Sequence, residues 1–130
     1  RRGDGESIRQ MMAACEATLA AGSPVMIFPE GTRSTDGRLK AFKHGAFTLA
    51  QRTKCAILPI VVTGTSRALP KRGFVLRGRH AIRVRVLDEI PVESFAGETV
   101  EQLTARVRGR IAAELEKMEA QAPALAPGAA

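Results

Sequence analysis

Residues 25–34 read VMIFPEGTRS, an apolar run that passes directly into a charged, hydroxyl-rich segment. Arg33 presents a planar fork of N–H donors that matches two oxygens of a phosphate group and stays charged at every relevant pH. Gly31 has no Cβ, so a ligand can approach its backbone N–H closely. Thr32 and Ser34 add hydroxyl donors. These residue types together predict a phosphate-binding site.

The carboxylate of Glu30 needs a separate explanation, because it would repel a phosphate group. We expect it to orient Arg33 or Lys43, or to accept a hydrogen bond from a hydroxyl group of the ligand. The alternative is a surface turn in which Glu30 and Arg33 form a local ion pair without function. Exposed pairs of this kind stabilise a fold by less than about 1 kcal/mol. Residue types alone leave both interpretations open.

A helix is predicted ahead of this segment. Ser7 and Gln10 have the spacing of a capping box, with Asp4 as a competing N-cap, and Gly22 is typical of a helix end. The opening residues RRGDGES read as a sharp turn without an initiator Met, so we expect the chain to be part of a longer protein. The apolar face of the helix consists of Ile8, Met11, Met12, Cys15 and Leu19.

Apolar runs at residues 24–28 and 56–64 are typical of strands buried on both faces of a parallel sheet. Pro59 cannot donate a ladder hydrogen bond, which implies a bulge, an edge or a strand end. Between the two runs, residues 44–53 predict a modest helix. Its inward side chains are Ala46, Phe47 and Ala50. The order of elements predicts an α/β fold with a mostly parallel or mixed sheet flanked by helices, its N-terminal part missing.

Residues 81–90 alternate between apolar and basic side chains, which predicts a half-exposed strand near the sheet edge. One face would carry Ile82, Val84 and Val86, and the other Arg83 and Arg85. These two arginines, with Arg77 and Arg79, either face anionic lipid headgroups or the phosphates of coenzyme A, or form a solvated edge.

A long terminal helix is predicted by a second capping box, formed by Thr99 and Gln102. Its apolar stripe consists of Val100, Leu103, Val107, Ile111, Leu115 and Met118. The Ala/Pro-rich residues that follow have nothing to bury and are expected to be disordered. We therefore expect one partial domain over residues 1–119 and a tail over residues 120–130.

The net charge of +7 is concentrated in the middle of the chain, where residues 33–85 contain thirteen Lys or Arg and one acid, Asp36. Such a field attracts nucleic acid, phosphorylated small molecules or an acidic membrane surface. Cys15 and Cys55 lack the spacing of a zinc site, and we expect buried thiols in a reduced compartment. No apolar run reaches the ~18 residues of a membrane span.

Three segments in order resemble the 1-acyl-sn-glycerol-3-phosphate acyltransferase (lysophosphatidate acyltransferase) family: FPEGTRS at 28–34, FKHGAF at 42–47 and ILPIVV at 57–62. In that family the first block binds the phosphate-bearing acceptor, a Phe-Lys-x-Gly segment follows, and an apolar strand with an embedded Pro comes next. The resemblance extends over residues 2–91.

The resemblance implies an enzyme that moves an acyl group from acyl-CoA or acyl-carrier protein to the free hydroxyl of 1-acylglycerol 3-phosphate, giving phosphatidic acid for phospholipid biosynthesis. Neither a metal nor a redox cofactor is expected. The enzyme would work at the cytoplasmic face of a membrane, on an anionic surface, without nucleic acid as a partner. The implied substrate-binding residues are Glu30, Gly31, Thr32, Arg33, Ser34, Lys43 and, from the trailing edge of an arginine block, Arg2.

The chain departs from the family at the catalytic signature, a histidine followed after four residues by an aspartate, in which the histidine acts as general base. Five residues after His44 and His80 stand Leu49 and Arg85, so neither histidine begins that signature. In the family the signature precedes the arginine block, and we expect it upstream of this chain. These 130 residues alone are therefore predicted to be inactive.

Other interpretations of the basic chain remain open at this stage. A non-catalytic acyltransferase-like protein would bind lipid phosphates without turnover. A nucleic-acid-binding module is the third class, although five Phe and neither Tyr nor Trp offer few stacking surfaces. His44 either touches the ligand phosphate or occupies a variable surface position, and His80 reads as a strand-end residue.

Overall fold

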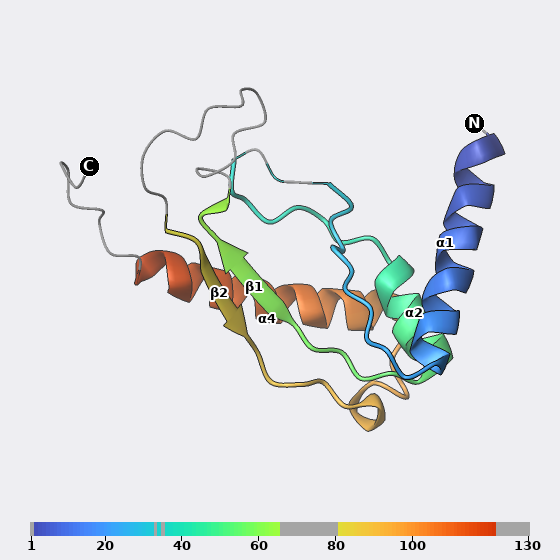
Figure 1. Ribbon diagram of the computed structural model, residues 1–130. Helices are drawn as coiled ribbons and strands as arrows, with labels where there is room; N and C mark the ends of the chain where they lie inside the picture. The colour runs from blue at the N-terminus through green and yellow to red at the C-terminus, as the bar shows by residue number, and fades with distance from the viewer. Residues whose placement is uncertain (1, 33, 35, 66–80, 122–130) are drawn as a thin grey trace.

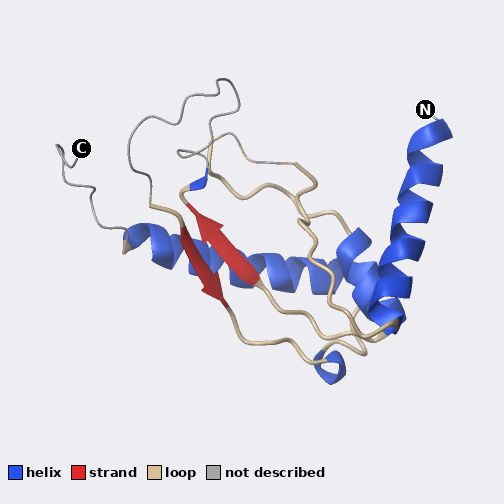
Figure 2. Cartoon of the chain, viewed as in Figure 1, coloured by secondary structure: helices blue, strands red, loops and turns tan. Residues whose placement is uncertain are grey.

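The computed structural model describes residues 2–32, 34, 36–65 and 81–121. The elements are α1 (Arg2–Ala20), α2 (Gly45–Thr53), β1 (Ile60–Thr63), β2 (Arg83–Val86), the short 3-10 turn η1 (Val92–Ser94) and α4 (Val100–Ala120). In Figure 1 and Figure 2, α4 runs behind the two strands. α2 packs against both α1 and α4, which links the N-terminal helix to the rest of the structure.

β1 and β2 form an antiparallel pair in which Ile60 lies opposite Val86 and Val62 opposite Val84. The predicted α/β class is confirmed, and of the mostly parallel or mixed sheet that was predicted, the described residues contain one antiparallel pair and no parallel pair. Within the described residues the ladder is antiparallel. A run of apolar residues indicates that a strand is buried on both faces, but it does not indicate whether the strand pairs in parallel or antiparallel.

Pro59 lies where the ladder of hydrogen bonds is interrupted, and a strand end was one of the three predicted alternatives for this residue. An isolated antiparallel bridge joins Ile57 to Ile90, and β1 begins only at Ile60. Pro59 has no N–H to give, and its carbonyl accepts the N–H of Leu87 at 2.9 Å. The proline therefore marks a strand end.

α1 begins at Arg2, so the predicted capping box at Ser7 and the predicted turn over RRGDGES are wrong. Gln10 does not cap the helix, because its side chain donates to Glu6 at 3.3 Å along the helix surface. Glu6 also accepts from Arg9 one turn on, and such pairs stabilise a helix locally.

The predicted end of α1 is confirmed. Gly22 adopts φ +89°, the left-handed conformation that glycine accepts without strain. Its N–H donates to Leu19 O, and the N–H of Ser23 donates to Thr18 O, which is the bond pattern of a Schellman motif.

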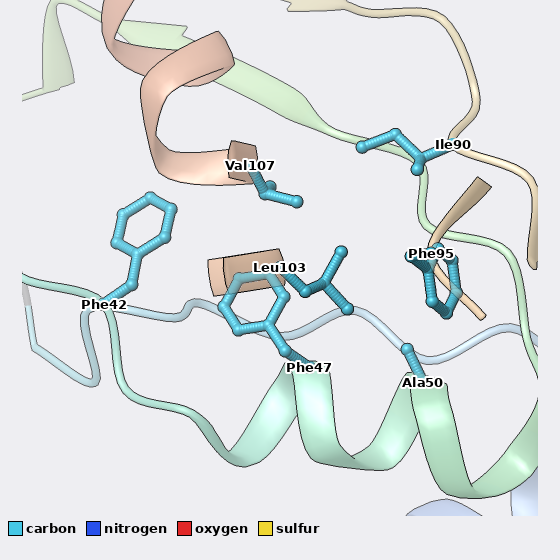
Figure 3. Close-up of a cluster of buried hydrophobic side chains, with 7 residues drawn as sticks. All are labelled: Phe42, Phe47, Ala50, Ile90, Phe95, Leu103 and Val107. Carbon is cyan, nitrogen blue, oxygen red and sulfur yellow. The ribbon is translucent and has the colours of Figure 1, made fainter. Parts of the chain in front are cut away.

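The hydrophobic core lies where α2 and α4 meet the chain around η1, as Figure 3 shows. It consists of Phe42, Phe47, Ala50, Ile90, Phe95, Leu103 and Val107. The inward face predicted for α2 is confirmed, since Phe47 and Ala50 are buried and Ala46 packs against them. The stripe predicted for the terminal helix is also confirmed at Leu103 and Val107.

The capping box predicted at the start of α4 is present. The Gln102 N–H donates to Thr99 Oγ1 at 3.2 Å, and the Thr99 N–H donates to Gln102 Oε1 at 3.0 Å. Because the side chains of Thr99 and Gln102 satisfy two backbone N–H groups at the helix start, the helix begins at a fixed residue.

β2 alternates between apolar and basic residues as predicted. The arginine face, however, lies against α4, and the valine face is exposed to solvent. Arg83 donates to Met118 O at 2.6 Å, and Arg85 pairs with Glu114, so both guanidinium groups lie against α4. Val84 and Val86 point away from α4 and are exposed. Arg83 and Arg85 therefore contact α4 and do not form a fully solvated edge, whereas Arg77 and Arg79 fall outside the described residues.

Residues 24–28 belong to no strand, so the buried strand predicted for this segment is wrong. Phe28 is 75% exposed, and Met26 is also on the surface. The two cysteines are free, as expected, but Cys15 and Cys55 are only half-buried. α4 reaches Ala120, and residues 122–130 of the predicted tail lie outside the described residues, as does His80.

Candidate phosphate-binding loop

The two ends of the candidate loop, residues 29–43, are joined by a backbone hydrogen bond. The Lys43 N–H donates to Pro29 O at 2.8 Å, which brings the second resembling block beside the first. The Gly31 N–H donates to Phe28 O at 3.0 Å and closes a tight turn. The structure thus unites Glu30 and Gly31 with Lys43, three of the residues predicted to bind the substrate.

Gly31 and Lys43 are matched to each other. Gly31 has φ +70°, and a Cβ built on it would lie 2.8 Å from Lys43 Nζ and 2.9 Å from Lys43 Cε. The Lys43 side chain therefore occupies the space that the Cβ of any other residue at position 31 would fill. A cationic group therefore lies beside a left-handed turn, and its charged donor is suited to a phosphate ligand.

Glu30 has a partner that the sequence did not indicate. Its Oε2 accepts the backbone N–H of Lys40 at 2.8 Å. The carboxylate therefore bridges the two arms of the loop, instead of orienting Lys43 through an ion pair. A hydrogen bond from an N–H to a carboxylate is stronger than one between neutral groups, so Glu30 is well suited to fix the loop shape.

Arg108 of α4 holds the same arm of the loop from outside. Its Nε donates to Lys40 O at 3.1 Å, and its Nη2 donates to Leu39 O at 3.0 Å. Sequence reasoning missed this residue, because a basic residue next to the apolar stripe of a helix is usually solvated. The connection from Arg108 through Lys40 to Glu30 couples the loop to α4, the helix that carries the buried Leu103 and Val107.

A second link from α4 reaches His44. The Thr104 hydroxyl donates to Val100 O at 2.7 Å, so His44 Nδ1, 3.0 Å from Thr104 Oγ1, must be the donor of that bond. The hydrogen therefore resides on Nδ1. His44 is exposed as predicted for a surface position, but its ring anchors the start of α2, next to Lys43, to the core.

Ser34 and Asp36 form a local turn on the other side of the loop. Ser34 Oγ donates to Asp36 Oδ1 at 2.8 Å, and the same oxygen accepts the Arg38 N–H at 3.0 Å. The Arg38 N–H and then the Ser34 hydroxyl hold the pKa of Asp36 below its ordinary value. Because its hydrogen is committed to Asp36, Ser34 would have to rotate before donating to a ligand.

The two predicted site arginines, Arg33 and Arg2, are not brought to the loop by any contact that the structure describes. Arg33 lies outside the described residues, between Thr32 and Ser34. Arg2 is the first residue of α1, and in Figure 1 the N-terminus lies at the end of that helix that points away from α2.

An open depression of about 410 Å³ lies between residues 36–39 and α4. Asp36, Glu116 and Glu119 line it, against a single guanidinium from Arg38. Three carboxylates would repel a phosphate group, so this depression is not an extension of the candidate site.

Two further properties bear on the chemistry. In the part of the chain that the structure describes, there is no group of three or more His, Cys, Asp or Glu side chains arranged to hold a metal ion. Across that same part, no helix is long and apolar enough to cross a bilayer.

Comparison with known proteins supports the family that the three sequence blocks resemble. Residues 1–63 match the sequence model of the Acyltransferase family. The chain is 36% identical over 118 residues to the chloroplastic 1-acyl-sn-glycerol-3-phosphate acyltransferase LPAT1 of Arabidopsis thaliana, covering 89% of this chain and 31% of that protein. It is 38% identical over 95 residues to the 1-acyl-sn-glycerol-3-phosphate acyltransferase of Saccharomyces cerevisiae, covering 71% and 31%.

A solved structure agrees with these relatives. The crystal structure of the 1-acyl-sn-glycerophosphate acyltransferase PlsC from Thermotoga maritima matches with a TM-score of 0.71 and 25% identity, over 87% of this chain and 46% of that chain. The chain therefore spans about a third of the length of these curated relatives and about half of the PlsC chain. The predicted resemblance is confirmed: over most of its length the chain is similar in sequence and fold to proteins of the 1-acyl-sn-glycerol-3-phosphate acyltransferase family.

Proposed function

We propose that this chain binds the phosphate group of the acceptor in an enzyme that acylates 1-acylglycerol 3-phosphate. The observation that carries the proposal is the Lys43 side chain crossing Gly31 inside a loop whose sequence resembles the family's acceptor-binding block. The product would be phosphatidic acid, an intermediate of phospholipid biosynthesis. Acyl-CoA or acyl-carrier protein would supply the acyl group as its thioester.

The proposed chemistry needs the acceptor to be held in one orientation. The acceptor hydroxyl attacks the thioester carbonyl, the carbon–sulfur bond breaks, and the proton lost by the hydroxyl ends on the departing thiol. Arg33 and Lys43 hold the phosphate group of the acceptor, and Arg2 adds a third cation. Fixing the phosphate fixes the hydroxyl a few bonds away, and such positioning lowers the barrier substantially.

The groups around these cations shape the loop. Glu30 bridges its two arms through Lys40, and Gly31 leaves room for the lysine. Thr32 and Ser34 would complete the pocket with hydroxyl groups. None of these residues removes the proton from the acceptor hydroxyl, and His44 does not have the family's catalytic spacing. We assign the base to a histidine outside these 130 residues, so the chain alone should bind acceptor without turning it over.

The location of the reaction follows from the substrate. An acceptor with an acyl chain resides in a membrane, and a chain of net charge +7 is attracted to an anionic surface. We therefore propose that the protein works at the cytoplasmic face of a membrane.

The direct test is binding of a short-chain 1-acylglycerol 3-phosphate by the chain, measured by calorimetry. Arg33→Ala and Lys43→Met should each weaken binding about tenfold or more, because each removes a charged hydrogen-bond donor. Lys117→Met is the matched control, since Lys117 is an exposed lysine near the end of α4. Equal weakening by the control would mean that only net charge matters, and would refute the assigned site.

The enzyme containing the catalytic signature provides a second test. There Arg33→Ala should raise the KM for the acceptor while the affinity for the acyl thioester is unchanged. Loss of thioester affinity to the same degree would show that Arg33 does not belong to the acceptor site.

A further inference from the structure

α4 holds the chain on both sides of Lys43. Ahead of the lysine, the Arg108 guanidinium donates hydrogen bonds to the carbonyl oxygens of residues 39 and 40. Behind it, Nδ1 of the His44 ring lies 3.0 Å from the Thr104 hydroxyl oxygen. We refer to residues 39–44 as the lysine arm. Both ends of this arm are bound to one helix, and the cationic residue lies between the two attachment points.

The two attachment points lie on the same side of α4. Thr104 and Arg108 are four residues apart, and side chains with this spacing lie one above the other on a helix. One residue before each of them, Leu103 and Val107 are buried in the core, as Figure 3 shows. Because the core fixes this side of the helix, a movement of the lysine arm away from α4 has to break hydrogen bonds.

Thr104 is well suited to hold a ring nitrogen, because it is buried, with 6% of its surface exposed. Its hydroxyl hydrogen is used in the bond to Val100 O at 2.7 Å, so its oxygen is left to accept from His44 Nδ1. A valine in its place would keep the shape of the side chain and remove the acceptor. The ring N–H would then lose its partner, and the arm would lose its second attachment.

The lysine arm also makes the contacts that form the candidate site. The Lys43 N–H donates to Pro29 O at 2.8 Å, and the Lys43 side chain occupies the space beside Gly31. A movement of the arm would therefore shift the Lys43 amine relative to the turn at Gly31. Hydrogen bonds from a charged donor to a phosphate group are short and depend on direction, so such a shift would weaken them.

We propose that Thr104 is a positioning residue of the acceptor site. It acts through His44, whose ring keeps the neighbouring Lys43 in place, and Arg108 acts from the other end of the lysine arm. The inference rests on the proposed function, in which the Lys43 amine binds the phosphate group of the acceptor. α4 lies outside residues 1–63, the part that matches the Acyltransferase family model. Affinity for the acceptor would therefore depend on a helix beyond the matching sequence blocks.

The first measurement is amide hydrogen exchange of the chain without ligand. Thr104→Val should speed exchange of the Lys43 N–H about fivefold or more, because the arm opens more often. The N–H of Ile90, which donates to Ile57 O in the core, should keep its rate. Thr104→Ser retains the hydroxyl group and should restore slow exchange at Lys43.

Thr53→Val is the matched control. Thr53 also donates its hydroxyl hydrogen to a carbonyl oxygen four residues earlier, Leu49 O at 2.7 Å, but it lies at the far end of α2. Unchanged exchange of the Lys43 N–H in Thr104→Val, or the same acceleration in Thr53→Val or at Ile90, would overturn the proposal. If Thr104→Val does not fold, His44→Ala removes the same bond from the exposed side and is judged by the same outcomes.

The second measurement is calorimetric binding of short-chain 1-acylglycerol 3-phosphate. Thr104→Val should weaken binding about threefold to tenfold, and Thr104→Ser should restore most of the affinity. Faster exchange at Lys43 with unaltered affinity would overturn the positioning role. If the unaltered chain did not bind this ligand, the proposed function would fail instead, and the exchange rates would still decide whether Thr104 holds the lysine arm.

Discussion

The hydrophobic core and the candidate phosphate-binding loop are built from different forces. The core around Leu103 and Phe95 is held by apolar contact between α2, α4 and the chain near η1. The loop from Pro29 to Lys43 is held by a few polar bonds, chiefly Glu30 to Lys40 and Arg108 to two carbonyls. Phe42 belongs to both regions, but Glu30 and Gly31 make no core contact, so substitutions at these two positions should affect ligand binding more than stability.

The largest effect is expected in the core. Leu103 has no exposed surface, and Leu103→Ala should destabilise the chain by about 2–5 kcal/mol, measured by urea denaturation. Leu58→Ala removes the same atoms from an exposed side chain and should cost well under 1 kcal/mol. Similar losses for both variants would show that the core is not the main source of stability.

Gly31→Ala comes next and should act on binding more than on folding. Its φ of +70° would strain alanine by about 1–2 kcal/mol, and the new Cβ would displace the Lys43 side chain. Gly22→Ala is the matched control, since Gly22 has φ +89° and open space around it. We expect comparable losses in Tm for both variants, with weaker binding of short-chain 1-acylglycerol 3-phosphate for Gly31→Ala alone. Unchanged binding would show that the contact with Lys43 has no role in the site.

Arg108→Gln tests whether α4 positions the loop. The variant loses charged donors to Leu39 O and Lys40 O, so we expect a loss of about 1–2 kcal/mol in stability and a severalfold weaker affinity for the same ligand. Arg108→Lys, which keeps a charged donor, should restore part of the affinity. Arg110→Gln changes an exposed arginine of the same helix and should leave affinity unaltered. If both glutamine variants bind equally well, the positioning role is wrong.

The smallest effect concerns pH. The fold lowers the pKa of Asp36, so it favours the ionised carboxylate. The stabilisation that ionised Asp36 gives the turn at residues 34–38 is therefore fully present above about pH 4, the ordinary aspartate pKa. It is lost as the pH falls through the lower pKa of the folded state. The Arg38 amide signal in NMR spectra should follow this titration. In Asp36→Asn that signal should not titrate, and a titration that persisted would assign it to another group.

Local patterns in the sequence determined much of the outcome. The Thr99–Gln102 capping box, the Gly22 helix end and the inward face of α2 depend on neighbours within a turn or two, so their spacing predicts them. The family resemblance could also be predicted from the sequence, because contiguous blocks of residues carry it.

Only the tertiary structure decided which side of β2 is covered, what Glu30 binds and that Arg108 reaches the loop. These facts depend on pairs far apart in sequence, such as Arg108 with Lys40 and Arg85 with Glu114. Alternation divides a strand into two faces but does not say which face meets a helix, because guanidinium groups can be buried when carbonyls and carboxylates receive them. The start of α1 is a different case, because it is a local feature that the predicted caps misplaced: the helix begins at Arg2, and Gln10 pairs with Glu6 along its surface.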